Sequence, residues 1–299
     1  MQVEVVLEKK VKTNMTTEFL RERTFEVNGL QIACKEWGRP GFTPIIALHG
    51  WLDNAASFDH LIPLMNNVHV IALDMMGHGK SSHRSADSFY EPWIDVGDVI
   101  SIADQMLWDE FTLLGHSRGA IISAFIAGTF PERIKNLFLI DGYVPYLHST
   151  KKSGDHLKRA IKENRRFSVA SPTYFRDFER AVHARVEGFV PLTYQAALTL
   201  AKRGVFEDAN GFFWGNDQRL KASNHIKFSE EQIRNFYENI IANVMLILAE
   251  NSAIGTAESQ EKFFDWIPQM QVKKLPGSHH LHLEDKSKDI ALLLQTLLN

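Results

Sequence analysis

The sequence predicts an α/β fold in which a mostly parallel sheet carries helices on both faces. Two observations lead to this prediction. Short apolar runs without polar alternation recur along the chain, as expected of strands buried on both faces of a parallel sheet. Longer amphipathic or small-residue stretches lie between these runs. Such alternation of strand and helix implies right-handed crossovers that place helices on both sides of the sheet.

The first regular structure is expected to be a hairpin. Residues 25–37 form two strand-like runs around Asn28-Gly29, a dipeptide typical of the tight turn between antiparallel strands. The buried strands that follow are predicted at Pro44–Leu48, Val68–Leu73, Phe111–Leu114, Leu137–Ile140, Val244–Leu248 and Gln271–Leu275. The helices between and after them are predicted at Ile94–Trp108, Ser117–Phe130, Thr256–Trp266 and Lys286–Leu298.

One segment interrupts this alternation. Residues 144–228 show no convincing central strand, and they are too many for a plain loop. Amphipathic helical pieces are predicted within them at His156–Arg166, Tyr174–Val186 and Thr193–Lys202. We therefore expect a helical cap at residues 144–228, inserted after the sixth strand, and a core made of residues 1–143 and 229–299.

Composition excludes several classes of protein. The net charge of −3 over 299 residues gives no basic field for phosphate neutralisation, so a nucleic-acid partner is not expected. A single cysteine, Cys34, rules out an intrachain disulfide, a zinc finger and an iron–sulfur cluster.

The N-terminal residues are charged throughout, and the longest dense apolar stretch, Val244–Ala249, is far too short for a membrane span. We therefore expect a cytoplasmic location without a membrane span.

The strongest functional signal is the motif at residues 115–119, GHSRG. It follows a predicted strand and opens a predicted helix, which is the setting in which G-x-S-x-G presents a nucleophilic serine. The glycines allow a tight turn, and the helix N-terminus favours negative charge near Ser117. The motif therefore predicts Ser117 as a catalytic nucleophile.

Serine is a weak nucleophile and requires a base. Residues 276–285, PGSHHLHLED, follow the last predicted strand and offer three histidines. His279 is the predicted base, His280 is the alternative, and His282 is expected on the first turn of the last helix. No metal site is expected, because the remaining histidines form no recognised ligand set with these three.

An oxyanion hole should complete the site. One backbone N–H is expected from Arg118, the residue after the nucleophile, and the second from the loop after an early strand. Residues 49–51, HGW, lie in that loop. Gly50 allows close backbone approach, so the N–H of Trp51 is the predicted second donor, and His49 is expected to have a structural role.

Several stretches of the sequence match one known family. They are residues 49–58 (HGWLDNAASF), 73–82 (LDMMGHGKSS), 115–119 (GHSRG) and, in the expected cap, 211–220 (GFFWGNDQRL). Together they resemble the α/β-hydrolase superfamily, and are similar to its serine-hydrolase-like (Kraken-type) branch, over residues 25–145 and more loosely over 240–299. The resemblance implies an eight-stranded, mostly parallel sheet and a Ser–acid–His triad.

The acid is the point at which this sequence departs from the superfamily. Most members place it in a Gly-x-x-Asp turn after the strand that follows the cap, whereas residues 249–252 read AENS. Some haloalkane dehalogenases place it instead at the end of the preceding strand, which here leads into Asp141. We expect Asp141 to be the acid, with Glu250 as the alternative and the absence of a functional acid as a third possibility.

The predicted function is hydrolysis of a carboxylic ester or related acyl small molecule, without a cofactor. A serine nucleophile argues against haloalkane dehalogenases and epoxide hydrolases, which use aspartate there. Two alternatives stay open: a carbon–carbon bond hydrolase of a diketone-like substrate, and a ligand-binding pseudo-hydrolase. Tyr143 and Trp214 are expected to line an apolar substrate pocket under the cap. The sequence indicates neither the physiological substrate nor the oligomeric state.

Overall fold

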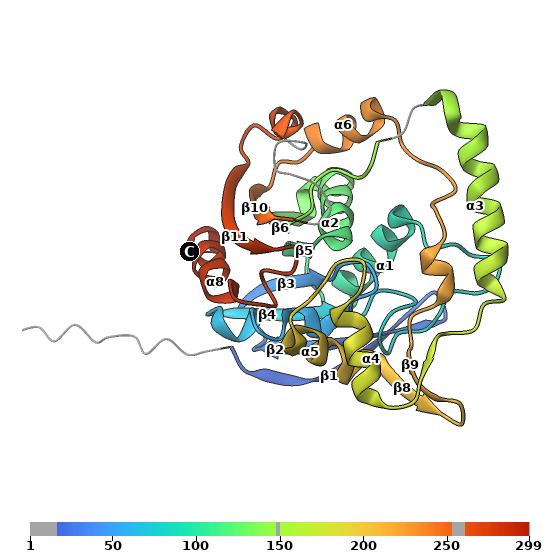
Figure 1. The fold of residues 1–299 in the computed structure, drawn as a ribbon. Coiled ribbons are helices and arrows are strands. Elements are labelled where there is room, and N and C mark those ends of the chain that lie inside the picture. Colours follow the sequence, from blue (N-terminus) through green and yellow to red (C-terminus); the bar gives the residue numbers. More distant parts are fainter. Residues whose placement is uncertain (1–16, 148–149, 253–260, 299) are drawn as a thin grey trace, which may run out of the picture.

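The computed structural model describes residues 17–147, 150–252 and 261–298, and its centre is an eight-stranded sheet (Figure 1). The strand order is β1-β2-β4-β3-β5-β6-β10-β11. The strands are β1 (Phe19–Val27), β2 (Leu30–Gly38), β3 (Thr43–Leu48), β4 (Val68–Leu73), β5 (Phe111–His116), β6 (Ile134–Ile140), β10 (Asn243–Asn251) and β11 (Gln271–Ser278). The β1–β2 and β2–β4 pairs are antiparallel, and the other five pairs are parallel. The predicted α/β class and mostly parallel sheet are confirmed.

Helices cover both faces of this sheet. Helices α1 (Pro92–Gln105), α2 (Arg118–Thr129) and α6 (Glu230–Glu238) lie on one side, and α8 (Ser287–Leu298) lies on the other (Figure 1). Alternate residues of β3 enter different cores, Ile46 and Leu48 packing with α1 and α2, and Ile45 and Ala47 packing with α8. This two-sided burial explains why the central strands read as continuous apolar runs.

The helix predicted at Thr256–Trp266 begins outside the described residues, which resume at Glu261. Its described end holds a short 3₁₀ helix at Phe264–Trp266.

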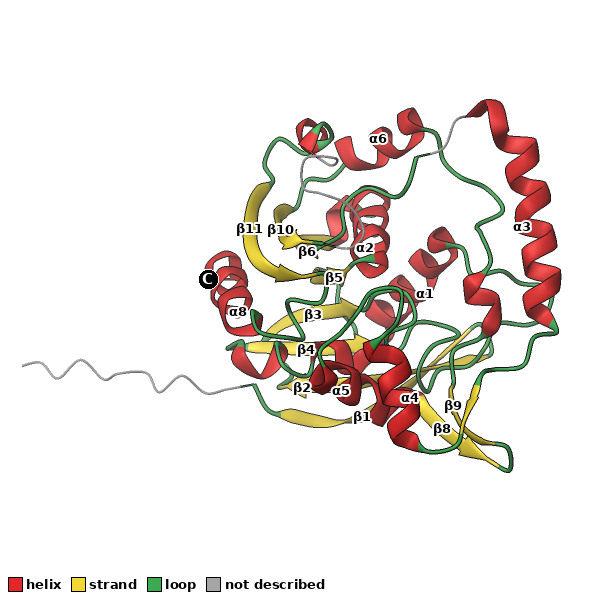
Figure 2. Cartoon of the chain, viewed as in Figure 1, coloured by secondary structure: helices red, strands yellow, loops and turns green. Residues whose placement is uncertain are grey.

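The insert, residues 150–228, contains both helices and strands. Its helices are α3 (Ser153–Ser168), α4 (Phe178–Val186) and α5 (Tyr194–Gly204). Its strands β7 (Tyr174–Phe175), β8 (Val205–Asp208) and β9 (Gly211–Trp214) form a separate antiparallel sheet in the order β7-β9-β8 (Figure 2). The insert predicted to be helical thus also contains a small sheet that was not predicted, and the helix predicted from Tyr174 begins only at Phe178. Ala209 and Asn210 form the turn between β8 and β9, and Gly211, at φ 119°, is the first residue of β9, where it pairs with Asp208.

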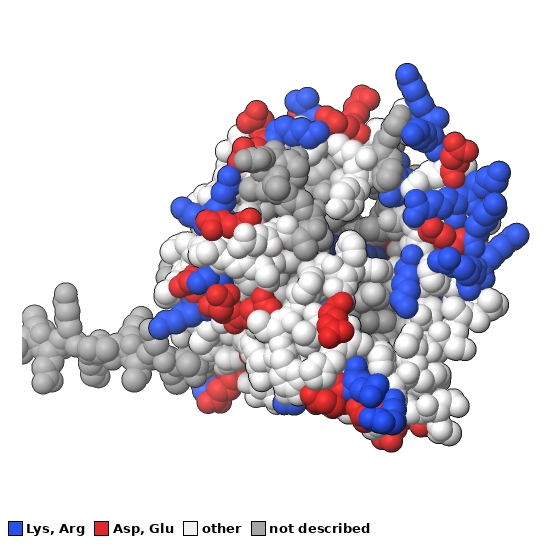
Figure 3. All heavy atoms as spheres, viewed as in Figure 1, with Lys and Arg blue, Asp and Glu red and all other residues white. Residues whose placement is uncertain are grey.

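Helix α3 is long but strongly polar. Its exposed basic side chains gather on one side of the molecule in Figure 3. They are Lys158, Arg159, Lys162, Arg165 and Arg166. No helix in the described ranges combines the length and the apolar character that crossing a membrane requires.

Buried charges attach the insert to the core. Arg203 of α5 contacts Oδ1 of Asp74 at 2.9 Å and both carboxylate oxygens of Glu22 at 2.7 Å. Asp74 is wholly buried after β4, and it also accepts the backbone N–H groups of Ala55 and Lys80. A buried carboxylate needs such compensation, so Arg203 fixes the position of α5 over this edge of the sheet.

We expect Arg203→Met to lower the free energy of unfolding by about 3 kcal/mol, because the buried Asp74 carboxylate would lose its cation. Urea unfolding followed by circular dichroism measures this change. Arg234→Met is the matched control, since Arg234 pairs with Glu238 on an exposed face of α6, and it should leave stability nearly unchanged. Equal effects of the two substitutions would contradict the role given to Arg203.

Candidate active site

Ser117 lies at the sharp bend between β5 and α2. Its backbone has φ 53° and ψ −117°, in a region that residues other than glycine rarely adopt. The Ser117 N–H donates to the carbonyl oxygen of Ile140 at 2.9 Å, which ties the bend to β6. A Cβ on Gly119 would lie 2.0 Å from the carbonyl oxygen of Leu48. Only glycine therefore allows the start of α2 to approach β3 this closely.

The loop after β11 brings His279 to this bend. The His279 Nε2 lies 2.9 Å from the Ser117 Oγ, and its Nδ1 lies 2.6 Å from Asp141 Oδ2. Both His279 and Asp141 are buried. An ionised carboxylate can only accept a hydrogen bond, so His279 donates through Nδ1 and presents the Nε2 lone pair to the serine hydroxyl.

Asp141 follows β6 directly and is held on two sides. Its backbone, at φ 43°, donates its N–H to the carbonyl oxygen of Ile247 at 2.7 Å. Its Oδ1 accepts the N–H of Ala249 at 2.9 Å, which leaves Oδ2 directed at His279. Glu250, the alternative acid, is exposed at the end of β10 and has no contact with His279 among the described residues.

The loop after β3 borders the same cavity as Ser117. The His49 Nε2 accepts the N–H of Met75 at 3.0 Å, so this histidine holds the loop in place. Within the described residues, no acceptor is assigned to the backbone N–H of Trp51 or of Arg118. The Trp51 side chain is anchored separately, because its Nε1–H donates to the carbonyl oxygen of Leu220 at 2.8 Å. Two backbone N–H groups without an acceptor among the described residues thus border the cavity that contains Ser117.

A cavity of about 590 Å³ opens between this site and the insert. It is lined by Ser117, His279 and both loops, and by aromatic side chains of the insert that include Phe175, Phe189 and Trp214. Trp214, predicted to line a substrate pocket, borders this cavity.

Tyr143 does not line this cavity, which corrects the second pocket prediction. Its side chain is wholly buried in the core, and its hydroxyl donates to the carbonyl oxygen of Phe263 at 2.9 Å. Its ring packs edge-on against the ring of Tyr237, on the side of the sheet that α2 covers. The backbone reversal after β6 carries Asp141 to the site and Tyr143 away from it.

The guanidinium of Arg118 has a fixed acidic partner. Its Nη2 lies 2.7 Å from Asp95 Oδ2 on α1. Asp95 is buried and also pairs with Arg84, which in turn contacts Asp98. The positive charge beside the nucleophile is therefore balanced within the protein.

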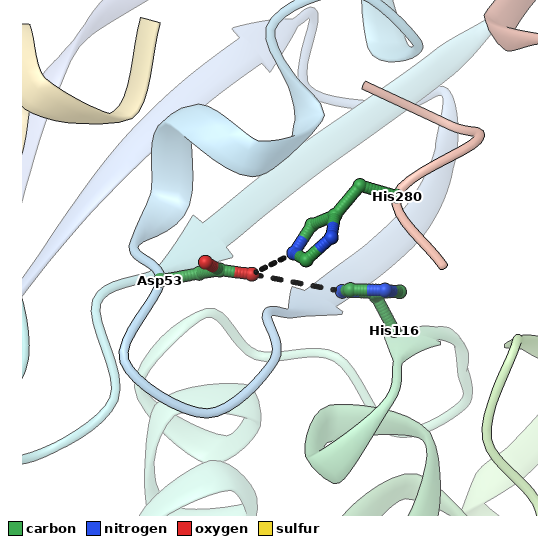
Figure 4. A group of neighbouring side chains, drawn as sticks. All are labelled: Asp53, His116 and His280. Carbon is green, nitrogen blue, oxygen red and sulfur yellow. Dashed lines mark hydrogen bonds and ion pairs between the residues drawn. The ribbon is translucent and has the colours of Figure 1, made fainter. Parts of the chain in front are cut away.

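A second group of polar side chains adjoins the base, and it contains His280, the alternative base (Figure 4). The His280 Nε2 contacts Asp53 Oδ2 at 3.0 Å, so His280 turns away from Ser117. Arg185 of α4 donates to Asp53 Oδ1 at 2.9 Å. Burial acts to raise the pKa of Asp53, but His280 and Arg185 hold that pKa well below its ordinary value. Asp53 is thus ionised, and no local sequence pattern pairs it with Arg185.

Two further histidines support the base loop. The His116 Nε2 donates to the carbonyl oxygen of His279 at 2.9 Å. Burial, followed by the nearby His282, His279 and His280, lowers the pKa of His116 well below its ordinary value, so this ring is neutral. His282 contacts Ser57 Oγ at 2.9 Å and precedes α8. It does not lie on the first turn of that helix, contrary to the prediction.

We expect Gly119→Ala to lower the free energy of unfolding by about 1–3 kcal/mol and to displace the bend, because its Cβ would overlap backbone atoms that cannot rotate away. Gly97→Ala on α1 is the control, since a Cβ there meets nothing within 4 Å. That substitution should raise stability by up to about 1 kcal/mol through helix propensity. Thermal and urea unfolding measure both changes, and a neutral Gly119→Ala would contradict the packing described for this bend.

Comparisons with known proteins identify the family. A family model described as alpha/beta hydrolase fold matches residues 43–286. Serine hydrolase-like protein 2 of Homo sapiens is 30% identical over 271 residues, which is 85% of this chain and 86% of that protein. A crystal structure of a hypothetical protein from Pseudomonas aeruginosa is 35% identical, with a TM-score of 0.87 over 93% of this chain and 98% of that one. The thioesterase domain from the curacin biosynthetic pathway shares the fold, with 22% identity and a TM-score of 0.82 over 93% of this chain and 99% of that one. The chain belongs to the α/β-hydrolase superfamily, in its serine-hydrolase-like branch.

Proposed function

We propose that this protein is a serine hydrolase that cleaves carboxylic esters or related acyl bonds of small molecules. The observation that carries this proposal is the continuous hydrogen-bonded chain from Ser117 Oγ through His279 to Asp141, at 2.9 and 2.6 Å. Nucleophile, base and orienting acid are the parts that acyl transfer by serine requires. Membership of a hydrolase superfamily supports the same chemistry.

The proposed mechanism gives each residue a role in two half-reactions. His279 Nε2 takes the hydroxyl proton as Ser117 Oγ attacks the carbonyl carbon, and it returns that proton to the leaving group. An acyl-enzyme on Ser117 then remains. Water attacks this ester while His279 again accepts a proton, and the acid product leaves as Ser117 is restored. Asp141 stabilises the imidazolium that forms in each step.

The backbone N–H groups of Trp51 and Arg118 are the proposed oxyanion hole. Both residues border the cavity beside Ser117, and neither N–H has an assigned acceptor among the described residues. Donors that are already oriented stabilise the developing oxyanion without reorganisation. The close approach of β3 to α2 at Gly119 brings the two donor-bearing segments together.

The cavity supports a small and largely apolar acyl group. Its volume of about 590 Å³ is in the range of small-molecule sites. Phe175, Phe189 and Trp214 supply aromatic surface from the insert. Two structural neighbours are described as a thioesterase domain and as an esterase of Mycobacterium tuberculosis, which agrees with cleavage of an ester or thioester. We propose residues 144–228 as the cap that selects the substrate.

We expect Asp141→Asn to lower kcat by about three orders of magnitude or more, because His279 would lose the partner that fixes its tautomer. Glu250→Gln is the control and should retain nearly full activity, since Glu250 does not contact the base. Steady-state hydrolysis of a short-chain p-nitrophenyl ester measures both. A mild loss for Asp141→Asn together with a severe one for Glu250→Gln would assign the acid to Glu250.

A fluorophosphonate probe should label the wild-type protein at Ser117, and Ser117→Ala should abolish both labelling and ester turnover. Peptide mass spectrometry locates the label. Folded wild-type protein that shows neither labelling nor turnover would favour a ligand-binding pseudo-hydrolase. Turnover of a diketone-like substrate without ester hydrolysis would favour the carbon–carbon hydrolase instead.

A further inference from the structure

Asp53, His116 and His280 form a compact group of metal-ligand side chains beside the proposed base (Figure 4). They come from the loop after β3, the end of β5 and the loop after β11. One nitrogen or oxygen of each lies within 4.8 Å of those of the other two, and all three residues are at most 2% exposed. The proposed hydrolysis mechanism uses none of their side chains directly.

The hydrogen bonds of His116 leave an unpaired acceptor in this group. Its Nε2 faces a carbonyl oxygen and must carry the proton, so the neutral ring has a lone pair at Nδ1. That Nδ1 is buried without a hydrogen-bond partner among the described residues, and it lies 3.8 Å from Asp53 Oδ2. Two electron-pair donors therefore face each other across a short gap, an arrangement that a cation would stabilise.

A glycine borders the gap between these two atoms. A Cβ on Gly50 would lie 2.9 Å from His116 Nδ1 and 3.2 Å from Asp53 Oδ2. Any larger residue would therefore crowd the gap. Gly50, Asp53, His116 and His280 all border the 590 Å³ cavity, so an ion has a route from solvent to the group.

We propose that Asp53, His116 and His280 form a binding site for Zn²⁺ or a similar transition-metal ion. Two imidazoles and one carboxylate are a common ligand set for such ions, whereas Mg²⁺ and Ca²⁺ prefer oxygen ligands alone. The ligands would be His116 Nδ1, Asp53 Oδ2 and His280 Nε2. The proton now at His280 Nε2 would move to Nδ1 of the same ring, an atom that has no partner among the described residues.

Arg185 limits the strength of this site. Its guanidinium donates to Asp53 Oδ1 and lies 3.4 Å from His280 Nε2, so its charge repels a bound cation. The metal would take the other carboxylate oxygen and bind reversibly. Removing the charge by Arg185→Met should therefore tighten Zn²⁺ binding by at least about tenfold.

Occupation of the site should inhibit hydrolysis, a consequence that rests on the proposed function. His116 holds the carbonyl oxygen of His279, and His280 is the next residue in the chain. Metal bonds of about 2.0–2.2 Å would draw His116 Nδ1 closer to Asp53 Oδ2, from which it now lies 3.8 Å. The base would then move relative to Ser117, with which it has a 2.9 Å contact.

Calorimetric titration of the metal-free full-length protein with zinc chloride tests binding without any need for turnover. We expect one saturable site in the wild type and at least tenfold weaker binding in His280→Gln, whose amide can still donate to Asp53. His183→Gln is the matched control, because it removes a histidine that pairs with Glu179 on an exposed face of α4. It should leave binding unchanged, and magnesium chloride should give no binding.

Three results would overturn the site: no saturable zinc binding in the wild type, full binding in His280→Gln, or loss of binding in His183→Gln alone. Thermal unfolding of each variant establishes that it is folded. Ester hydrolysis with and without Zn²⁺ then tests inhibition, which His280→Gln should relieve; inhibition that persists in this variant would overturn the link to the base. Zinc binding in a protein that hydrolyses no ester would leave the metal site standing and contradict only the proposed hydrolase activity.

Discussion

The left-handed backbone of Ser117 is the constraint around which the described site is arranged. Ser117 has a positive φ at the bend between β5 and α2. Gly119, two residues later, has no side chain and therefore lets the start of α2 approach the end of β3 closely. The same bend bonds to Ile140, the last residue of β6, so Asp141 follows at a fixed distance from the serine. One local backbone conformation thus sets the separation between the hydroxyl, the β3 loop and the acid. The base comes from the loop after β11, much further along the sequence.

Buried charge pairs determine how the insert sits over this arrangement. Asp74 and Asp53 lie in core loops, and each binds an arginine of the insert, Arg203 from α5 and Arg185 from α4. Such pairs add little net stability when compared with apolar packing, but the loss of one partner is costly. They therefore favour one position of the insert over others. Because the Asp53 pair also contains His280, the position of α4 is coupled to the loop that carries His279.

The features of the fold and of the candidate site that could be predicted from the sequence are those carried by neighbouring residues. The central strands appear in the sequence as runs of consecutive apolar residues, and the GHSRG motif is also continuous. The fold class and the position of Ser117 could therefore be predicted from the sequence. The pairing of β8 with β9 was not predicted, because each strand has only four residues and their turn, Ala209-Asn210, is not a typical hairpin dipeptide. Tyr143 was misplaced because the direction of a side chain after a strand depends on the reversal that follows. Asp53 and Arg185 are 132 residues apart, and no local pattern links residues at such a distance.

The two adjacent histidines show how backbone direction separates two sites. His279 and His280 are chemically identical, and their rings are nearly perpendicular, at 87°. One ring meets Asp141 and Ser117, and the other meets Asp53. A shift of the loop by one residue would exchange them, so the contacts of His280 with Asp53 and of His116 with the His279 carbonyl also fix the register of His279. The second His–Asp pair thus contributes to the geometry of the first, and anything that binds to the second must act on the position of the base.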